Sequence, residues 1–251
     1  MELGNVSFRR DHDFQNVLSL PIDFDEDFKI WRYLSLPKFL KFLEDEYLYL
    51  APLSEFDDPF EGTFPKTYPE TVENFVEKYN MPKGPAQGYE YHLKQVKDHA
   101  FINCWHINNY ESAAMWSIYS KTNESVAVKS SFSTLQEEVG NQAQLGAVAY
   151  IDYETDYIPQ GNMNFHCLCK RKSYAYEKEF RVIEYDMESH LGGGESDDFK
   201  TVDINLGDLI ESIYVSPDAP EYFPELISSI SEKYGYDFDI NKSKIDADPF
   251  Y

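Results

Sequence analysis

The stretch Phe28-Lys-Ile-Trp-Arg-Tyr-Leu34, followed by Ser35-Leu-Pro-Lys-Phe-Leu-Lys-Phe-Leu43, decides the fold class of this chain. The first half predicts a β-strand that is rich in aromatic and branched residues. In the second half, apolar residues repeat at helical spacing behind a Ser-x-Pro start signal, which predicts an amphipathic helix. A strand that leads directly into a helix indicates a protein in which the two kinds of element are mixed.

The same kinds of signal continue along the chain. Further strands are predicted at 47–50, 100–105, 125–129, 147–153, 165–170, 179–185 and 209–215. Further helices are predicted at 72–79, 89–98, 115–119, 131–139 and 222–234, with a loop at 80–88. We therefore expect an α+β fold, with a mixed or split, mostly antiparallel sheet and helices packed around it. One domain over 1–251 is expected, with no internal repeat.

Composition and charge limit the classes of function. The chain has 251 residues, of which 42% are hydrophobic, so it can bury a large core. Its formal net charge of −23 disfavours general binding to nucleic acid or to anionic lipid. No apolar run is long enough to span a bilayer, and the start resembles no signal peptide. Three cysteines are too few for a disulfide framework, so a cytoplasmic location is expected.

The few arginines are more informative than the many acids. The chain has five: Arg9 and Arg10 near the amino terminus, and Arg32, Arg171 and Arg181 in the most specialised segments. Arg32 lies between Trp31 and Tyr33, and strand alternation sends it to the opposite face from both. If that face is buried, the guanidinium needs an acidic partner or an anionic ligand. An internal salt bridge and a ligand site both fit the pattern.

A second segment combines polar and aromatic residues between a strand and a short helix. It contains Asn103-Cys-Trp-His106, then Tyr110-Glu-Ser112, and then Met115-Trp-Ser-Ile-Tyr119. This arrangement can present a histidine, an amide and a phenol to one cleft. Trp116 and Tyr119 share a helix face. Packing in the core explains Trp105, Met115 and Trp116, whereas His106 and Tyr119 fit either a pocket wall or the core.

A third segment places carboxylates beside cations. Lys170-Arg-Lys172 is followed by Glu177-Lys-Glu-Phe-Arg181, and on a strand Glu177, Glu179 and Arg181 would share one face. Such a face could hold a carboxylate with a tuned pKa, because a neighbouring carboxylate raises the pKa and the arginine lowers it. A cross-strand ladder of ion pairs explains the pattern as well.

Metal sites are disfavoured by spacing. His166-Cys-Leu-Cys169 and Cys104-Trp-His106 lack the usual zinc-finger separations. The segment Asp57-Asp-Pro-Phe-Glu61 lacks the glycine and ligand spacing of a calcium loop. The chain also has no phosphate-binding glycine loop, no dinucleotide fingerprint and no serine-nucleophile elbow.

In combination, these segments resemble a bacterial family called domain of unknown function 2971. The resemblance rests on Trp31-Arg-Tyr33, Phe56-Asp-Asp-Pro-Phe-Glu61, Cys104-Trp-His106, Met115-Trp-x-x-Tyr119, Lys170-Arg-Lys172 with Glu177-x-Glu-x-Arg181, and Ile213-Tyr-Val-Ser-Pro217. It covers a core of about 28–216, with a carboxy-terminal strand and helix extension at 217–251. Membership implies no activity.

The order of the motifs also resembles ADP-ribosyltransferase folds, which bind NAD in the cleft of a split sheet. The resemblance implies NAD as substrate and ADP-ribosyl transfer or NAD cleavage as reaction. Arg32 would bind the NAD phosphates, Tyr119 would stack near the nicotinamide, and Glu177 or Glu179 would contact the ribose and assist transfer. A Ser-Thr-Ser middle motif is missing, and Arg181 would neutralise the carboxylate on which catalysis depends.

Two hypotheses follow from these observations. The first is an enzyme or enzyme-like domain that binds an anionic nucleotide, with Glu177, Glu179 and Tyr119 as catalytic residues. Its predicted nucleotide-binding residues are Arg32, Tyr33, His106, Trp116, Arg171 and Arg181. The second is a non-catalytic interaction or sensor module of bacterial stress or phage defence, which would bind a protein partner. In that case the same residues form a buried ion network.

Overall fold

The computed structural model of the chain describes residues 2–3, 6–7, 16–23, 27–68, 77–78, 95–159, 162–192, 197–247 and 249. Most of the helix predicted at 72–79, most of the helix at 89–98, the loop at 80–88 and both amino-terminal arginines lie outside these residues. The chain forms two compact units: unit 1 from 1–23, 49–103 and 141–201, and unit 2 from 24–48, 104–140 and 202–251. The single domain expected from the sequence stays a prediction.

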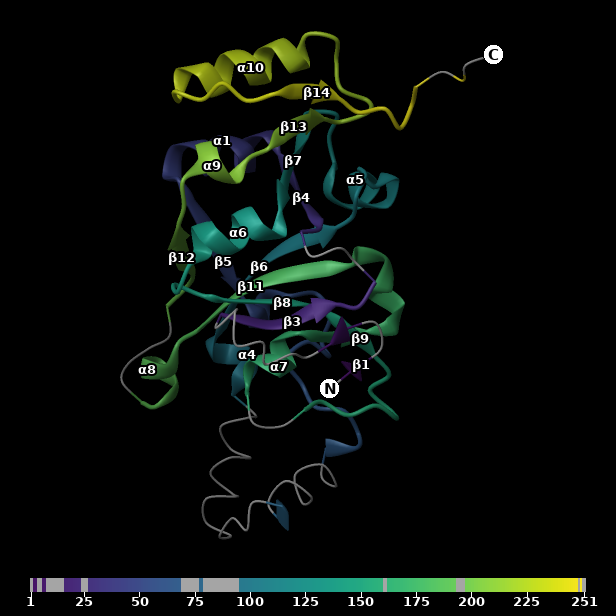
Figure 1. Cartoon of the computed structure of the whole chain (residues 1–251), viewed down its shortest axis with the longest axis vertical. Helices are drawn as coiled ribbons and strands as arrows, with labels where there is room; N and C mark the ends of the chain where they lie inside the picture. The colour runs from purple at the N-terminus through teal and green to yellow at the C-terminus, as the bar shows by residue number, and fades with distance from the viewer. Residues whose placement is uncertain are drawn as a thin grey trace. The chain divides into compact units, whose positions relative to one another are not determined.

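Unit 1 is built around three neighbouring strands. β3 (Val17–Pro21) pairs parallel with β8 (Gln144–Ala147), and β8 pairs antiparallel with β11 (Glu179–Tyr185), as Figure 1 shows. Phe180, Val182 and Leu145 are fully buried there. Gly146 of β8 is paired with Arg181 of β11. A Cβ added at Gly146 would lie 2.5 Å from a methyl group of Leu168. The absence of a side chain at this position is therefore what lets Leu168 pack against the sheet.

Other elements surround these strands in unit 1 or continue from it. They are β1 (Glu2–Leu3), β2 (Val6–Ser7), β5 (Tyr47–Pro52), η1 (Leu53–Glu55), α4 (Val96–His99), β6 (Ala100–Ile107), β9 (Ala149–Ile151), β10 (Cys169–Arg171), η2 (Lys172–Glu177), α8 (Met187–His190) and β12 (Lys200–Asp203). Strands β5, β6 and β12 begin in one unit and end in the other.

The strand predicted at 165–170 is wrong in its first half. Residues Asn164–Cys167 form the short helix α7, and only Cys169–Arg171 are extended, as β10, which pairs parallel with β9. The Asn162 side chain explains the helix, because its Oδ1 accepts a hydrogen bond of 3.0 Å from the Asn164 amide. Such a turn starts a helix despite the apolar composition of the residues that follow.

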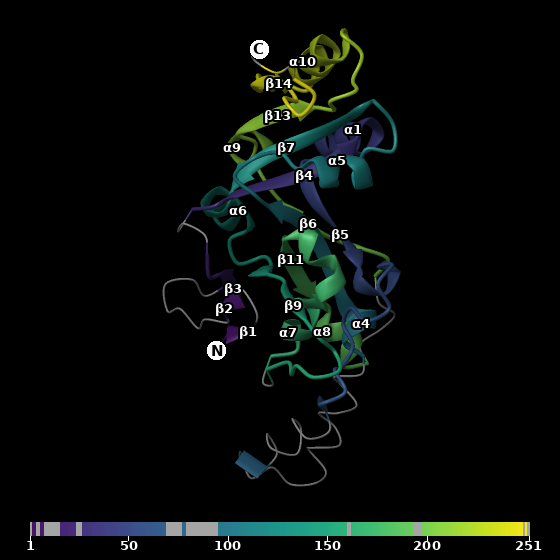
Figure 2. The same cartoon turned by 90° about the vertical axis from the view of Figure 1, so that its right-hand side faces the viewer.

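Unit 2 contains the strand predicted at 28–34 and the helix predicted to follow it. β4 (Lys29–Ser35) pairs antiparallel with β7 (Ser125–Ser131), β7 pairs antiparallel with β13 (Ser212–Val215), and β13 pairs parallel with β14 (Ile240–Lys242). Figure 2 shows β13, β7 and β4 side by side. The helices of the unit are α1 (Leu36–Asp45), α5 (Ala113–Tyr119), α6 (Phe132–Val139), α9 (Leu206–Leu209) and α10 (Phe223–Lys233).

The step from β4 to α1 follows from its sequence. Ser35 is extended, Pro37 lies in the first turn of the helix, and Glu46 ends it in the left-handed conformation with φ of 54°. Phe39, Phe42 and Leu43 form the buried face. α6 begins at a serine cap as predicted, because Ser131 Oγ accepts a hydrogen bond from the Thr134 amide.

The predicted α+β class, with a mixed, mostly antiparallel sheet and helices around it, is confirmed. Among the strand pairs whose register is described, those that run parallel are β3 with β8, β9 with β10, and β13 with β14. Within the described ranges, no helix has the length and apolar character that crossing a membrane requires.

Candidate functional site

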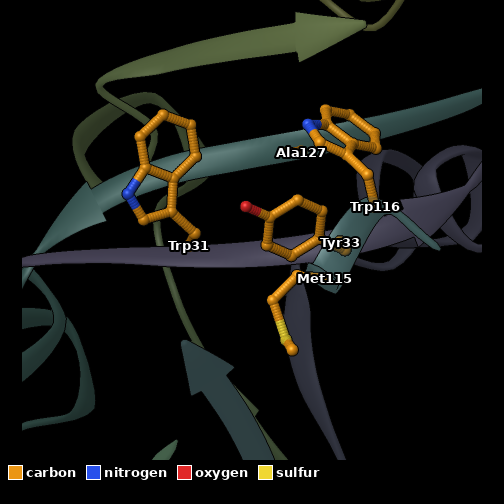
Figure 3. Packing of buried hydrophobic residues seen from close by; sticks show 5 residues of the cluster. All are labelled: Trp31, Tyr33, Met115, Trp116 and Ala127. Carbon is orange, nitrogen blue, oxygen red and sulfur yellow. The ribbon is translucent and has the colours of Figure 1, made fainter. Parts of the chain in front are cut away.

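The aromatic side chains of unit 2 pack into one cluster on one face of β4. Trp31 and Tyr33 project to the same side, and Met115 and Trp116 from α5 pack on them together with Ala127 (Figure 3). The Tyr33 and Trp116 rings meet edge to face with centroids 5.0 Å apart. All five residues are buried, which is the arrangement expected of a core.

The polar tips of this cluster have partners within the unit. The Tyr33 hydroxyl accepts a hydrogen bond of 2.8 Å from the Ser112 amide, and the Trp116 indole donates one of 2.9 Å to Glu111. Burial raises the pKa of Tyr33 above its ordinary value, so the phenol stays protonated. For Tyr33 and Trp116 the packing interpretation therefore accounts for every contact described.

His106 and Tyr119 differ in exposure. His106 is buried, and its ring lies beside Tyr33 with centroids 6.3 Å apart, so it belongs to the same face of β4 as the aromatic cluster. Tyr119 ends α5 and is 48% exposed. Of these two residues, Tyr119 is therefore the more exposed to solvent.

Arg32 lies on the opposite face of β4, as strand alternation predicts. Its guanidinium carbon is 6.0 Å from the ring centroids of both Phe42 and Trp105. The structure thus separates Arg32 from Tyr33, His106 and Trp116, because successive side chains of a strand point to opposite faces. Phe42 and Trp105 were not predicted as neighbours of Arg32, since only pairing of β4 with β6 and the position of α1 bring them there.

No carboxylate in the described part of the chain forms an ion pair with the positive charge of Arg32. None of the ion pairs or hydrogen bonds between described residues involves its guanidinium, and its Nη1 is buried without a hydrogen-bond partner. Burial lowers the pKa of this guanidinium to about 10, and the group still carries its proton at neutral pH. The guanidinium thus lies half-buried near two aromatic rings, without a carboxylate partner among the described residues.

Arg181 in unit 1 is surrounded by acceptors instead. Its Nε donates to Glu179 at 2.7 Å, its Nη1 donates to the Cys167 carbonyl at 2.6 Å, and its Nη2 pairs with Glu61. The side chain is completely buried. Glu61, named in the sequence only as part of a turn, is therefore a counter-ion from 120 residues away. No local pattern could have revealed that pairing.

Lys170 joins the same group. Its ammonium lies 2.5 Å from Glu177, 2.7 Å from Glu179 and 3.1 Å from Glu61. Burial acts to lower the pKa of Lys170, but the charge of Glu179 and its neighbours outweighs burial and raises it. We call Glu61, Lys170, Glu177, Glu179 and Arg181 the buried ion network of unit 1.

The pKa values of Glu177 and Glu179 are shifted in opposite directions. Burial and a hydrogen bond to Glu179 raise the pKa of Glu177 to about 8. Burial also acts to raise the pKa of Glu179, but the Arg181 charge outweighs it and lowers that pKa well below its ordinary value. At neutral pH Glu179 is therefore a carboxylate, and Glu177 holds a proton. Two like-charged neighbours that share a proton in this way form a tuned acid pair.

The remaining predicted binding residue, Arg171, has its own partners in unit 1. Its guanidinium lies 2.9 Å from Asp58, and it stacks over Phe60 at 4.8 Å and over Tyr174 at 5.4 Å. Glu177, Glu179, Arg171 and Arg181 are thus grouped in unit 1, while Arg32, Tyr33, His106, Trp116 and Tyr119 belong to unit 2. Among the residues described, no three His, Cys, Asp or Glu side chains are grouped as a metal ion would require.

Comparisons with known proteins give a distant structural likeness. No family model matches the chain, so membership of domain of unknown function 2971 stays a prediction, and no curated protein matches it significantly. Solved structures of DarT from Thermus sp. 2.9 are similar at 12% identity: the complex with NAD+ has a TM-score of 0.41 and is covered over 98% of its chain and 88% of this one. The complex with ADP-ribosylated single-stranded DNA has a TM-score of 0.40, with 96% and 88% covered. A likeness of this size transfers neither a site nor an activity.

Proposed function

We propose that this protein binds an anionic nucleotide, with a phosphate group of the ligand at Arg32. The observation that carries the proposal is the unbalanced charge of Arg32, whose Nη1 is buried without a partner. An unpaired buried cation is unfavourable, because burial removes its hydration and nothing replaces it. A phosphate would supply both the missing negative charge and the hydrogen-bond acceptors.

NAD is the nucleotide that we propose, and cleavage of NAD or transfer of its ADP-ribosyl group is the proposed reaction. This step rests on the order of the motifs: an arginine on an early strand, a hydroxyl-bearing aromatic at Tyr119, and the late Glu177-x-Glu179. In the proposal Tyr119 stacks near the nicotinamide, and the carboxylate pair assists transfer. The titration of that pair supports it, since Glu179 stays ionised while Glu177 holds a proton near pH 7.

Calorimetric titration with NAD tests the binding step. The Arg32→Met variant keeps the apolar stem of the side chain and removes its charge, so we expect NAD affinity to fall at least tenfold. Lys29→Met is the matched control, because it removes a cation from the same strand at a position paired with Glu211. Equal NAD affinity in wild type and Arg32→Met would contradict the assignment of Arg32.

Release of nicotinamide tests the reaction separately. If the carboxylate pair assists transfer, Glu177→Gln will bind NAD as wild type does but release nicotinamide more slowly, by about a hundredfold. Wild-type protein that binds NAD and releases no nicotinamide would leave the binding proposal intact and end the catalytic one.

A second candidate is the non-catalytic interaction or sensor module. The buried ion network favours this second candidate, because the charges of Glu179 and Arg181 are both paired inside unit 1. Under this interpretation the carboxylates are structural, and an anionic ligand at Arg32 acts as a signal. Nucleotide binding without turnover, together with loss of stability on substitution of Glu179, is its expected result.

A further inference from the structure

A cavity of about 640 Å³ in unit 1 has an unusual lining. Its size falls within the range of about 300–1,000 Å³ that is typical of small-molecule sites. Six of its lining residues carry amide side chains: Asn16, Asn141, Gln142, Gln144, Asn162 and Asn164. None of the described lining residues is a lysine, arginine or histidine, and the charged one among them is Glu184.

Elements of the unit hold several of these amides in place. Gln144 begins β8, and its ladder partner is Ile183 of β11, which also lines the cavity. The Asn164 Nδ2 donates to the Gln144 Oε1, and the Asn162 Oδ1 accepts from the Asn164 amide at 3.0 Å. The main-chain carbonyl of Asn16 accepts a hydrogen bond of 2.8 Å from the Leu145 amide, which fixes the backbone at this position. Gln144 and Asn164 are therefore oriented by the fold, whereas Asn141 and Gln142 are exposed at the edge of the lining.

These internal bonds leave further polar atoms for a ligand. The Gln144 Nε2, the Asn162 Nδ2 and the Asn164 Oδ1 make no hydrogen bond to any residue in the described ranges. Each of these three amides thus has one end engaged by the protein and one end available, so the cavity offers donors and an acceptor together. A hydroxyl group is itself both donor and acceptor, and it matches such a lining.

We propose that this cavity binds a neutral, polyhydroxylated ligand, a free sugar by its chemistry. An anionic ligand is disfavoured, because no cationic side chain among the described lining residues would meet it and the Glu184 carboxylate would repel it. A mainly apolar ligand would leave the amides without partners. Glu184, which also lines the cavity, supplies a further acceptor for a hydroxyl group. The inference concerns unit 1 and goes beyond the nucleotide proposed at Arg32.

Titration of the full chain, followed by the side-chain amide signals of asparagine and glutamine in NMR spectra, tests this proposal. The probes are D-ribose, D-glucose and maltose, with the free base adenine and inorganic phosphate as alternatives. We expect at least one sugar to shift the Gln144 and Asn162 signals in a saturable way below about 50 mM. Saturable shifts with adenine or phosphate and none with the sugars would overturn the proposal, as would no response to any probe.

Variants connect the response to the cavity. Gln144→Met combined with Asn162→Leu removes two available donors, and we expect sugar affinity to fall by roughly tenfold. Asn123→Leu, an exposed amide of unit 2, is the matched control and should leave the affinity unchanged. If the double variant folds poorly, Asn141→Ala at the exposed edge of the lining gives a smaller loss of affinity. Unchanged affinity in folded variants would overturn the site.

Discussion

Arg181 in unit 1 and Arg32 in unit 2 both lie inside a strand between large apolar residues, but their charges are balanced differently. Arg181 is fully buried and donates to Glu179, Glu61 and the Cys167 carbonyl. Arg32 has aromatic neighbours, and its buried Nη1 has no partner. The first charge is balanced by the protein, whereas the second has no counter-charge among the described residues, and we propose that a bound anion supplies it.

The largest expected effect is the loss of Arg181. Arg181→Met would leave Glu61 and Glu179 buried without that cation, so we expect the free energy of unfolding to fall by about 3–5 kcal/mol. The melting temperature should fall by roughly 10 °C. Urea unfolding measures the first quantity and thermal melting the second.

The control for Arg181 is an exposed cation. Lys66→Met removes one partner of a pair with Glu154 in which both side chains are more than 70% exposed, and it should change stability by less than about 0.5 kcal/mol. A similar, small effect for Arg181→Met would show that the network is not structural and would remove the contrast.

An intermediate effect, which depends on pH, is expected for Glu177. Its folded-state pKa of about 8 lies above the ordinary value of 4.5, so its contribution to stability is fully present below pH 4.5 and is lost as the pH rises through 8. Glu177→Gln keeps a hydrogen-bonding group without the charge. The variant should therefore gain stability relative to wild type between pH 5 and pH 9, by at least about 1 kcal/mol.

Urea unfolding at several pH values measures this divergence. Glu154→Gln, which removes one exposed surface carboxylate, corrects for the change in net charge. A stability difference between Glu177→Gln and wild type that stays constant from pH 5 to pH 9 would contradict the raised pKa.

The smallest expected effect is that of Arg32 on the protein without ligand. Because Arg32→Met removes a charge that has no partner in the described residues, stability should be unchanged or rise by up to about 1 kcal/mol. Urea unfolding in ligand-free buffer measures it. A loss as large as that of Arg181→Met would mean that Arg32 is held by a protein carboxylate, and the contrast would disappear.

The sequence predicted the local geometry around both arginines. Alternation correctly sent Arg32 to the face opposite Trp31 and Tyr33, and Glu179 and Arg181 to one side of a strand. These predictions succeeded because the side-chain period of a strand is a local property. Glu177 lies in the turn before that strand, in η2, and still reaches Lys170.

What the sequence could not predict were the partners. Glu61 meets Arg181 across 120 residues, and Trp105 and Phe42 meet Arg32 only through strand pairing and helix packing. The short helix at Asn164–Cys167 was predicted as a strand because the turn closed by the Asn162 side chain outweighs the apolar pattern. Whether a buried arginine is paired or open depends on such long-range contacts, and no spacing encodes them.

Thermal melting of wild type and Arg32→Met over a range of NAD concentrations, with Lys29→Met as control, tests the contrast between the two arginines most directly. A ligand that binds the folded state stabilises it by about 2.7 kcal/mol at a hundred times its dissociation constant. We predict that NAD raises the melting temperature of wild type and Lys29→Met in parallel and leaves that of Arg32→Met unchanged. An equal rise in all three proteins, or in none, would contradict the account.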